Sequence, residues 1–575
     1  MKKILPIIIV IIAIIGVGAG LVVGILAGKY APTEELMDYA AQFELDDDEY
    51  TIALNAEILE ERAVSADGRV YLGLSLVTEQ INTRFYYDDR ENVFIYTTPT
   101  QRMLITPDQQ TYTVSAWEAD SEADEGYVIV RTIDDQLYVA ADYVTQYTQM
   151  DYAEYTDPNR IVIRTEWPAI RTVTVTKETA LRYRGGVKAE VLATLEEGTA
   201  LTVLDEYDDW TMVESPDGYI GWVNTEHISE AVDDQLTAPD FEEPVYTSIP
   251  RGHKIIMGWH QVMNTSANEN ISSVLDETSG INTISPTWFY FGDTEGNVTS
   301  IASADYVSTC HARGVEVWAL FSNEFAVGGG ERSFDTAMTS EVLSCTSKRQ
   351  NAIRQVISYA VDNGIDGINI DFEAIDPEYA DDYIEFIREL SIACRAKAII
   401  LSVDNYVPAY TSYYNRKEQG IVADYVVIMG YDEYTAGSDE PGPVASLDYV
   451  RQGIADTVAM VDPAKVINGM PFYSRVWSTD ADGNVSSFAC GMEEALGYLT
   501  AHGVTPEYLE DYGLNYGSYT SDVDGNFYEI WLQDADSIDR FMALAVEQDI
   551  AGVAAWKIGF ESSSDIWQTI SGYYH

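Results

Sequence analysis

Basic residues are scarce in this sequence of 575 residues. It contains 33 Lys and Arg against 94 Asp and Glu, which gives a formal net charge of −61. Nucleic-acid binding requires a basic surface, so the composition argues against that class of partner. An anionic membrane surface would be repelled for the same reason. Because acidic residues are so common, a short acidic motif is informative only in a clear structural context.

Cysteine is also rare. The four cysteines, Cys310, Cys345, Cys394 and Cys490, all lie in the C-terminal half, and none forms a CxxC pair. They therefore give no indication of a metal or redox site. Outside the cytoplasm they could pair in three ways, while buried free thiols are an equally good interpretation.

One stretch lacks charge completely. Ile4–Gly28 follows Lys2 and Lys3 and has no charged residue. As a helix it would measure roughly 37 Å at about 1.5 Å per residue, enough to cross a bilayer. We expect an uncleaved membrane anchor with residues after Lys29 outside the cytoplasm. A cleaved signal peptide, giving a secreted protein, is the alternative.

The rest of the chain divides by composition and pattern. We predict an anchor at 1–29, an acidic spacer at 30–48, an α+β repeat domain at 49–166, an SH3-like domain at 170–231, a linker at 232–250 and a (β/α)8 barrel at 251–575.

An internal repeat defines the first of these domains. Val70–Thr98 aligns without gaps on Leu137–Thr165. Each copy predicts a strand, a short helix and a β-hairpin, and two copies are expected to form one compact α+β unit. The pattern resembles the repeat domain at the N-terminus of copper amine oxidases and of many bacterial surface proteins. Residues 30–165 contain no histidine, so we expect a stalk or wall-contact module without copper.

Short strands separated by turn signals follow at 170–231, which favours a small barrel. The closing stretch "DGYIGWVNTEHI" resembles bacterial SH3-like domains of envelope proteins. That resemblance implies binding to cell-wall peptide or a spacer role. We expect Trp210 and Trp222 to be core residues rather than a binding face.

From Arg251 onward, apolar runs alternate with helical patterns, which predicts a parallel sheet. The eight strand candidates are "KIIMGWHQV", "INTISPTWFYF", "VEVWALFS", "GINIDFE", "AIILSVDNY", "YVVIMGYDEY", "VINGMPFYS" and "GVAAWKIGF". Eight such units fit a (β/α)8 barrel. The long interval between the seventh and eighth strands is expected to hold an inserted α+β subdomain.

The stretch "DGINIDFE", Asp366–Glu373, places acids on one face of the fourth strand. Ile368 and Ile370 alternate with Asn369, Asp371 and Glu373, and alternate side chains share a face. Residues at the carboxyl ends of barrel strands face the active site, so we expect these polar groups inside the barrel mouth. A solvent-exposed loop or a Ca²⁺ site are weaker interpretations.

This stretch resembles the DxxDxDxE signature of glycoside hydrolase family 18, with Asn369 in place of the second acid. The substitution is similar to that in bacterial spore-cortex and peptidoglycan N-acetylglucosaminidases. Further motifs follow in the family's order. "IMGYDEY" supplies Met429, Tyr431 and Asp432, and the run into the last strand supplies Trp556.

The resemblance implies a mechanism in which Glu373 is the general acid and the substrate's own N-acetyl oxygen is the nucleophile. Asp371 would hold the acetamide nitrogen, and Asn369 would hydrogen-bond Asp371 from below. With a neutral amide there, Asp371 should ionise more readily. The implied outcome is retention of configuration, without metal or organic cofactor.

The resemblance also implies substrate contacts. Tyr431 would bind the acetamide, Asp432 the sugar hydroxyls, and Trp556 the face of the pyranose. Asp366 and Met429 complete the motifs. Trp259, Tyr290 and Tyr473 end other strands and are candidates to line the groove, whereas His260 is expected to be structural.

We therefore expect an envelope-anchored hydrolase of β-1,4-linked N-acetylglucosamine in peptidoglycan or its fragments. Chitin or chitooligosaccharide is the alternative substrate. A non-catalytic sugar-binding protein and a structural adhesin are alternatives of other classes, and the presence of Glu373 favours catalysis.

Overall fold

The structure is a computed structural model that describes residues 31–325 and 332–574. The predicted anchor, Ile4–Gly28, lies outside the described residues. Within those residues, no helix combines the length and the apolar character needed to cross a membrane.

The described chain divides into two compact units. The first contains the residues up to Phe85 together with Ile105–Thr111 and Asp124–Glu243. The second contains Tyr86–Leu104, Tyr112–Ala123 and the residues from Pro244 onward. The predicted 49–166 domain is therefore shared between the two units.

The first unit holds two seven-stranded sheets. One has the order β11(Asp151–Tyr155), β12(Arg160–Arg164), β1(Glu49–Leu54), β2(Glu57–Ala66), β3(Arg69–Gly73), β10(Gln136–Ala140), β9(Val130–Ile133). The other has the order β15(Val191–Leu195), β14(Thr179–Arg182), β18(Ile220–Asn224), β17(Trp210–Glu214), β16(Ala200–Tyr207), β13(Ala169–Thr174), β19(Val232–Gln235). The second sheet matches the predicted SH3-like domain.

The two tryptophans of the SH3-like domain are not core residues. The core of this domain consists of aliphatic side chains such as Val173, Leu201 and Val213. Trp210 and Trp222 are only partly buried and stand outside this cluster. The expectation that they form the core is wrong, because the small valines and leucines already fill it.

Both repeat copies have the predicted local structure. The first reads β3, the π-helix η1(Leu76–Ile81), β4(Phe85–Asp88) and β5(Val93–Thr97). The second reads β10, α3(Ala141–Tyr147), β11 and β12. The β11–β12 hairpin pairs with β1, whereas β4 and β5 belong to a separate sheet. The expectation that both copies form one unit is therefore wrong for the β4–β5 hairpin of the first copy. The resemblance to the amine-oxidase repeat stays a prediction.

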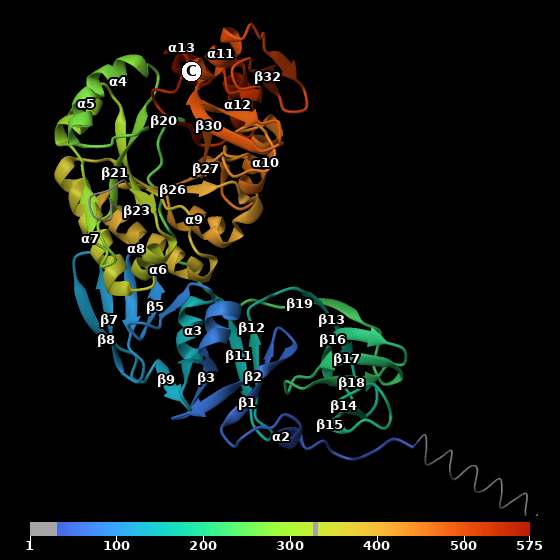
Figure 1. The fold of residues 1–575 in the computed structure, drawn as a ribbon. Helices are drawn as coiled ribbons and strands as arrows, with labels where there is room; N and C mark the ends of the chain where they lie inside the picture. Colours follow the sequence, from blue (N-terminus) through green and yellow to red (C-terminus); the bar gives the residue numbers. More distant parts are fainter. Residues whose placement is uncertain (1–30, 326–331, 575) are drawn as a thin grey trace, which may run out of the picture. The chain divides into compact units, whose positions relative to one another are not determined.

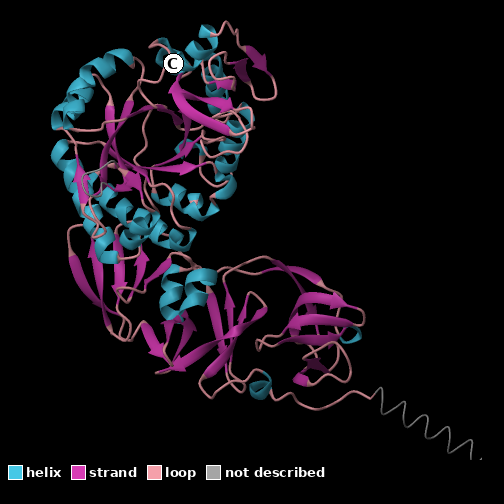
Figure 2. Cartoon of the chain, viewed as in Figure 1, coloured by secondary structure: helices cyan, strands magenta, loops and turns pink. Residues whose placement is uncertain are grey.

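The second unit contains a closed barrel of eight parallel strands. Figure 2 shows the ring of strands in magenta inside an outer layer of cyan helices. Around the ring, the strands are β20(Ile255–His260), β21(Thr283–Phe291), β23(Glu316–Phe325), β25(Gly367–Asp371), β26(Ile400–Tyr406), β27(Tyr425–Met429), β28(Val466–Pro471) and β34(Gly552–Trp556). All eight predicted strands are confirmed.

Helices cover the outside of the barrel. They are α4(Ile271–Glu277), α5(Ala304–His311), α6(Thr336–Leu343), α7(Thr346–Asn363), α8(Ala380–Lys397), α9(Arg416–Val422), α10(Leu447–Val458), α12(Ala535–Glu547) and α13(Asp565–Gly572). The strands are apolar because they are buried on both faces; every residue of β27 is buried. Gly552 allows β34 to lie very close to β20, because a Cβ at this position would lie only 2.1 Å from the carbonyl oxygen of Ile255.

The predicted insertion between the seventh and eighth strands is also present. A five-stranded sheet and the helix α11(Met492–Ala501) occupy it. The sheet order is β30(Val485–Gly491), β29(Tyr473–Thr479), β33(Phe527–Leu532), β32(Leu514–Thr520), β31(Glu507–Leu509). It has its own small core of apolar residues, including Val476, Leu499 and Ile530.

A second five-stranded sheet, which we call the β4–β8 sheet, was not predicted. Its order is β4, β5, β6(Gln101–Ile105), β7(Thr111–Ala116), β8(Asp120–Asp124), and nearly all of it belongs to the barrel's unit. Its side chains reach the helices α7 and α8. The hydroxyl of Thr97 donates to Glu385, and Arg102 pairs with Glu389 at 3.3 Å.

Buried ion pairs hold these helices together. Arg349 of α7 lies 3.1 Å from Glu389 of α8, and both side chains are fully buried. Arg388 pairs with Glu385 at 3.2 Å and with Glu418 at 2.9 Å. Removing one member of such a pair leaves an uncompensated charge in a low-dielectric interior.

We predict that Arg349→Met lowers the free energy of unfolding by about 3–5 kcal/mol, because Glu389 loses its nearest buried cation. The matched control is Arg451→Met, which removes an exposed pair with Asp448 and should cost at most about 1 kcal/mol. Urea titrations followed by tryptophan fluorescence measure both. Equal losses in the two variants would contradict the prediction.

Candidate active site

The fourth strand, β25, sends its apolar and polar residues to opposite sides as its alternation predicts. Ile368 and Ile370 are fully buried. Phe372, just after the strand, stacks on Phe386 of α8 with ring centroids 5.2 Å apart. Asn369 and Asp371 face the barrel interior, and Glu373 follows on the same side.

A cavity of about 140 Å³ opens at the carboxyl ends of the strands. Its lining residues are Trp259, Asp371, Glu373, Asp404, Tyr406, Met429, Tyr431, Asp432, Tyr473 and Trp556. Strand ends from β20, β25, β26, β27 and β34 and the first residue of β29 contribute to it. The structure therefore brings together most of the predicted site residues.

Glu373 is fixed through both its side chain and its backbone. The hydroxyl of Tyr406 donates to Oε2 at 2.7 Å. The buried amide of Asn323 binds the backbone twice, accepting from the N–H at 2.8 Å and donating to the carbonyl at 2.7 Å. Burial raises the pKa of Glu373, the bond from Tyr406 lowers it, and the charges of Asp432 and Glu324 raise it further.

Asp371 has an unused acceptor. Its Oδ1 is buried and has no hydrogen-bond partner among the described residues. Burial raises the pKa of Asp371 well above its usual value, and the neighbouring charges of Glu373 and Asp404 raise it further. The expectation that Asp371 ionises more readily is therefore wrong, because a carboxylate from the next strand replaces the one that Asn369 removes.

Asn369 hydrogen-bonds other residues than predicted. Its Oδ1 accepts from the indole of Trp259 at 2.9 Å and from Ser285 at 3.0 Å. Its Nδ2 donates to Ser402 at 3.1 Å and to Asp404 at 2.6 Å. The partner carboxylate is thus Asp404 and not Asp371, since the amide reaches sideways to β26.

Three residues of the site were not predicted from the sequence: Asp404, Tyr406 and Asn323. Asp404 is buried, and burial raises its pKa well above the usual value. The available signal was the alternation Ser402, Asp404, Tyr406 in a strand that begins with Ile400 and Leu401. It matches the pattern of β25, and it places polar groups on the inward face in the same way.

Aromatic rings form the opposite wall. Trp259 lies 6.0 Å from Trp556 and 6.5 Å from Tyr431, measured between ring centroids. Tyr431 lies 6.1 Å from Tyr473, whose hydroxyl donates to Asp432 at 2.6 Å. Asp432 has a positive φ of 60°, which fits its place in the turn after β27.

Two predicted site residues lie elsewhere. Asp366 precedes β25 at the opposite end of the strand, where it accepts from the backbone N–H of Val317 at 2.8 Å and lies 2.8 Å from His311. Its place in the motif is therefore structural. The guanidinium of Arg332 lies 4.7 Å from the centroid of the Tyr290 ring. Tyr290 lines neither the 140 Å³ cavity nor the second cavity of about 340 Å³ beside it.

His260 is structural, as expected. It hydrogen-bonds the hydroxyl of Tyr306 at 2.7 Å. Burial, and to a lesser degree the charge of Lys557, lowers the pKa of His260 to about 4.

All four cysteines are free thiols, three of them buried. Within residues 31–325 and 332–574, no group of three or more His, Cys, Asp and Glu side chains is placed to hold a metal ion.

A second cavity of about 340 Å³ shares Asp371, Glu373 and Trp556 with the first. Its other lining residues are Gln261, Met263, Thr287, Leu320, Ser322, Glu324, Arg332 and Phe334. The acid pair therefore lies where two cavities meet. Such a site can accept a chain that continues on both sides of the reacting bond.

Comparison with known proteins identifies two domains. The family model "Glycosyl hydrolases family 18" matches residues 324–561, and "Bacterial SH3 domain" matches residues 177–229. A Bacillus subtilis protein provisionally named a sporulation-specific glycosylase (YdhD) is 29% identical over 241 residues, which cover 41% of this chain and 56% of that protein. The cortical fragment-lytic enzyme of Bacillus anthracis is 24% identical over 234 residues, covering 40% and 54%.

The chain thus spans about half the length of these two curated relatives. Among solved structures, the spore cortex-lytic enzyme SleL of Bacillus cereus has a TM-score of 0.50 at 19% identity, covering 67% of this chain and 90% of that one. At this identity the likeness supports the fold. The chain therefore contains a bacterial SH3 domain within residues 177–229 and a glycosyl hydrolase family 18 domain matched over residues 324–561 of the barrel.

Proposed function

We propose that the barrel hydrolyses β-1,4 glycosidic bonds of N-acetylglucosamine in peptidoglycan or its fragments, with Glu373 as the general acid. The observation that carries this proposal is the pair of buried carboxyls, Asp371 and Glu373, on one wall of the cavity with raised pKa values. A carboxyl with a raised pKa keeps the proton that a glycosidic oxygen needs as it leaves.

In the first step Glu373 gives its proton to the glycosidic oxygen and the bond from that oxygen to C1 breaks. The carbonyl oxygen of the substrate's own acetamide attacks C1 and forms an oxazolinium ring. In the second step the Glu373 carboxylate takes a proton from water as the water attacks C1, and the bond from C1 to the acetamide oxygen breaks and restores the acetamide. Two displacements at C1 retain its configuration.

Asp371 is the partner of the acetamide in this scheme. Its unpaired, buried Oδ1 offers an acceptor for the acetamide N–H, and satisfying a buried acceptor is favourable. When Asp371 ionises, its negative charge stabilises the positive oxazolinium. The hydrogen bond from Asn369 to Asp404, at 2.6 Å, fixes the neighbouring carboxyl whose charge acts on Asp371.

The aromatic wall supplies the remaining contacts. Trp556 borders both cavities and offers an apolar face for the pyranose. Tyr431 and Asp432 border the first cavity, where their side chains can bind the acetamide and the hydroxyls. Met429 contributes apolar surface beside them.

Peptidoglycan is favoured over chitin by the SH3 domain in the same chain and by curated relatives named as cortical fragment-lytic enzymes. Chitooligosaccharide remains the alternative substrate of the same chemistry. A sugar-binding protein without catalysis is the alternative of another class, and the presence of Glu373 with a pKa raised by burial argues against it.

The proposed site of action is outside the cytoplasm, at the cell membrane. The basis is the uncharged stretch Ile4–Gly28 after Lys2 and Lys3. Protease treatment of intact cells tests this location, because an outward-facing barrel is digested while a cytoplasmic marker survives.

We predict that Glu373→Gln lowers kcat by about 10²–10⁴-fold, because the amide cannot donate a proton to the leaving oxygen. The matched control, Glu547→Gln, changes an exposed residue at the end of α12 and should retain full activity. Mass spectrometry of sugars released from purified peptidoglycan, and separately from chitooligosaccharides, measures the effect.

The same experiment separates the alternatives. New N-acetylglucosamine reducing ends from the wild type and the control, but not from Glu373→Gln, establish the hydrolase, and the better substrate chooses between wall and chitin. Wild type and Glu373→Gln that are equally inert but bind the sugars would refute the proposal in favour of a binding protein.

We predict that Tyr406→Phe moves the basic limb of kcat/KM to higher pH by about one unit. The Tyr406 hydroxyl stabilises the charged carboxylate and so lowers the pKa of Glu373. Without it that pKa rises, and Glu373 keeps its proton to higher pH. The pH profile of each variant gives the shift, and a limb that stays in place or moves to lower pH is the contrary result.

A further inference from the structure

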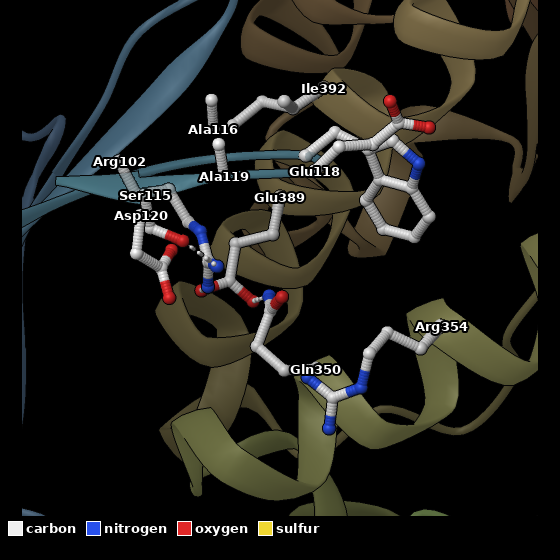
Figure 3. A pocket seen from close by; sticks show the side chains of 11 residues that line it. Arg102, Ser115, Ala116, Glu118, Ala119, Asp120, Gln350, Arg354, Glu389 and Ile392 are labelled. Atoms are coloured by element: carbon white, nitrogen blue, oxygen red, sulfur yellow. Dashed lines mark hydrogen bonds and ion pairs between the residues drawn. The ribbon is translucent and has the colours of Figure 1, made fainter.

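A separate cavity of about 270 Å³ lies on the outer side of the barrel, between the β4–β8 sheet and the helices α7 and α8. Its lining residues are Arg102, Ser115, Ala116, Trp117, Glu118, Ala119, Asp120, Gln350, Arg354, Glu389 and Ile392. In Figure 3, Arg102, Ser115 and Asp120 come from the blue sheet, while Gln350, Arg354 and Glu389 come from the helices. None of these residues takes part in the proposed catalysis.

An adjacent cavity of about 570 Å³ shares Ala116, Trp117, Glu118 and Ile392 with it. Ligand sites commonly measure about 300–1,000 Å³. Trp117 thus borders both parts of a groove large enough for more than one small group.

Trp117 is held in place at the tip of the β7–β8 hairpin. The backbone N–H of Ala116 donates to the carbonyl of Ala119 at 2.9 Å and closes the turn. The adjacent Glu118 forms an ion pair with Lys397 at the end of α8. The Trp117 side chain is only partly buried, and its indole N–H donates to none of the described residues. Part of the ring packs against the apolar core of the barrel, and the exposed part, with a free donor, is offered to the groove.

The polar groups around Trp117 are fixed and partly unpaired. Arg102 is anchored by Glu389 at 3.3 Å and by Ser115 at 3.0 Å. Gln350 donates to Glu389 at 2.9 Å, which orients its amide and leaves its Oε1 without a partner among the described residues. Arg354 is exposed and has no ion-pair or hydrogen-bond partner in the described part of the chain.

This combination suits a neutral ligand with many hydroxyls. Arg354 and the Trp117 indole supply donors, while Gln350 and Asp120 supply acceptors, and a sugar hydroxyl uses both kinds. The indole face suits the apolar C–H face of a pyranose. Glu389 is shared by Arg102 and Arg349, and the chain's formal net charge of −61 disfavours an anionic ligand.

We propose that the groove around Trp117 is a second glycan-binding site, which holds a β-linked N-acetylated glycan strand away from the catalytic cavity. The choice of this glycan rests on the proposed function. Such a site keeps the enzyme on an insoluble polymer between cleavage events, since a second contact raises the effective concentration of the strand at the first.

Binding is tested in the full chain carrying Glu373→Gln, so that no polymer is degraded. Trp117→Ala should weaken binding to insoluble peptidoglycan or chitin about tenfold. Phe488→Ala is the matched control, because it removes an exposed aromatic ring from β30 that lines none of the cavities described here. Equal binding by the Trp117→Ala and Phe488→Ala proteins would overturn the proposal.

Activity is tested with Glu373 intact. Trp117→Ala should slow sugar release from the insoluble polymer about tenfold and leave kcat/KM for a soluble chitooligosaccharide within about twofold of the wild type. Equal loss on both substrates would overturn the proposal, because the site would not be separate from the catalytic cavity. If no variant hydrolyses either substrate, the proposed function fails, while the binding assay still decides the glycan site.

Discussion

The barrel interior depends on one hydrogen bond between strands, from Nδ2 of Asn369 to Oδ1 of Asp404 at 2.6 Å. Asn369 also accepts from Trp259 and Ser285, so its amide both donates and accepts in a fully buried position. An ionised aspartate there could accept but not donate, and it would face Asp404 as a second negative charge. The amide at position 369 therefore accommodates the carboxyl of Asp404, which stands on the neighbouring strand β26.

Charge burial also joins the β4–β8 sheet to the barrel. Arg349 and Glu389 are fully buried between α7 and α8, and Arg102 reaches Glu389 from the sheet. Such pairs gain little over apolar packing but cost much when broken, so they favour one arrangement over others. Arg102 and Glu389 also line the groove around Trp117. The ion pair that joins the sheet to the helices therefore also forms part of the proposed glycan-binding site.

The fold of the barrel could be predicted because parallel strands are buried on both faces and therefore appear as apolar runs. The active site could be predicted along β25, where Asn369, Asp371 and Glu373 alternate with apolar residues, and at the motif residues that end other strands, such as Tyr431 and Trp556. Asp404 and Asn323 reach the site from other strands, and pairing between strands is not encoded in local spacing. Asp366 was misassigned because its place in the motif lies at the far end of the strand, where it accepts from Val317.

The acidity of the chain bears directly on the proton of Glu373. A protein with a formal net charge of −61 surrounds its buried carboxyls with negative potential, which disfavours losing a proton. Asp432 and Glu324 act on Glu373 in this direction at short range, while only the Tyr406 hydroxyl opposes it. An acid catalyst needs that proton. The composition that disfavours nucleic acid therefore supports acid catalysis.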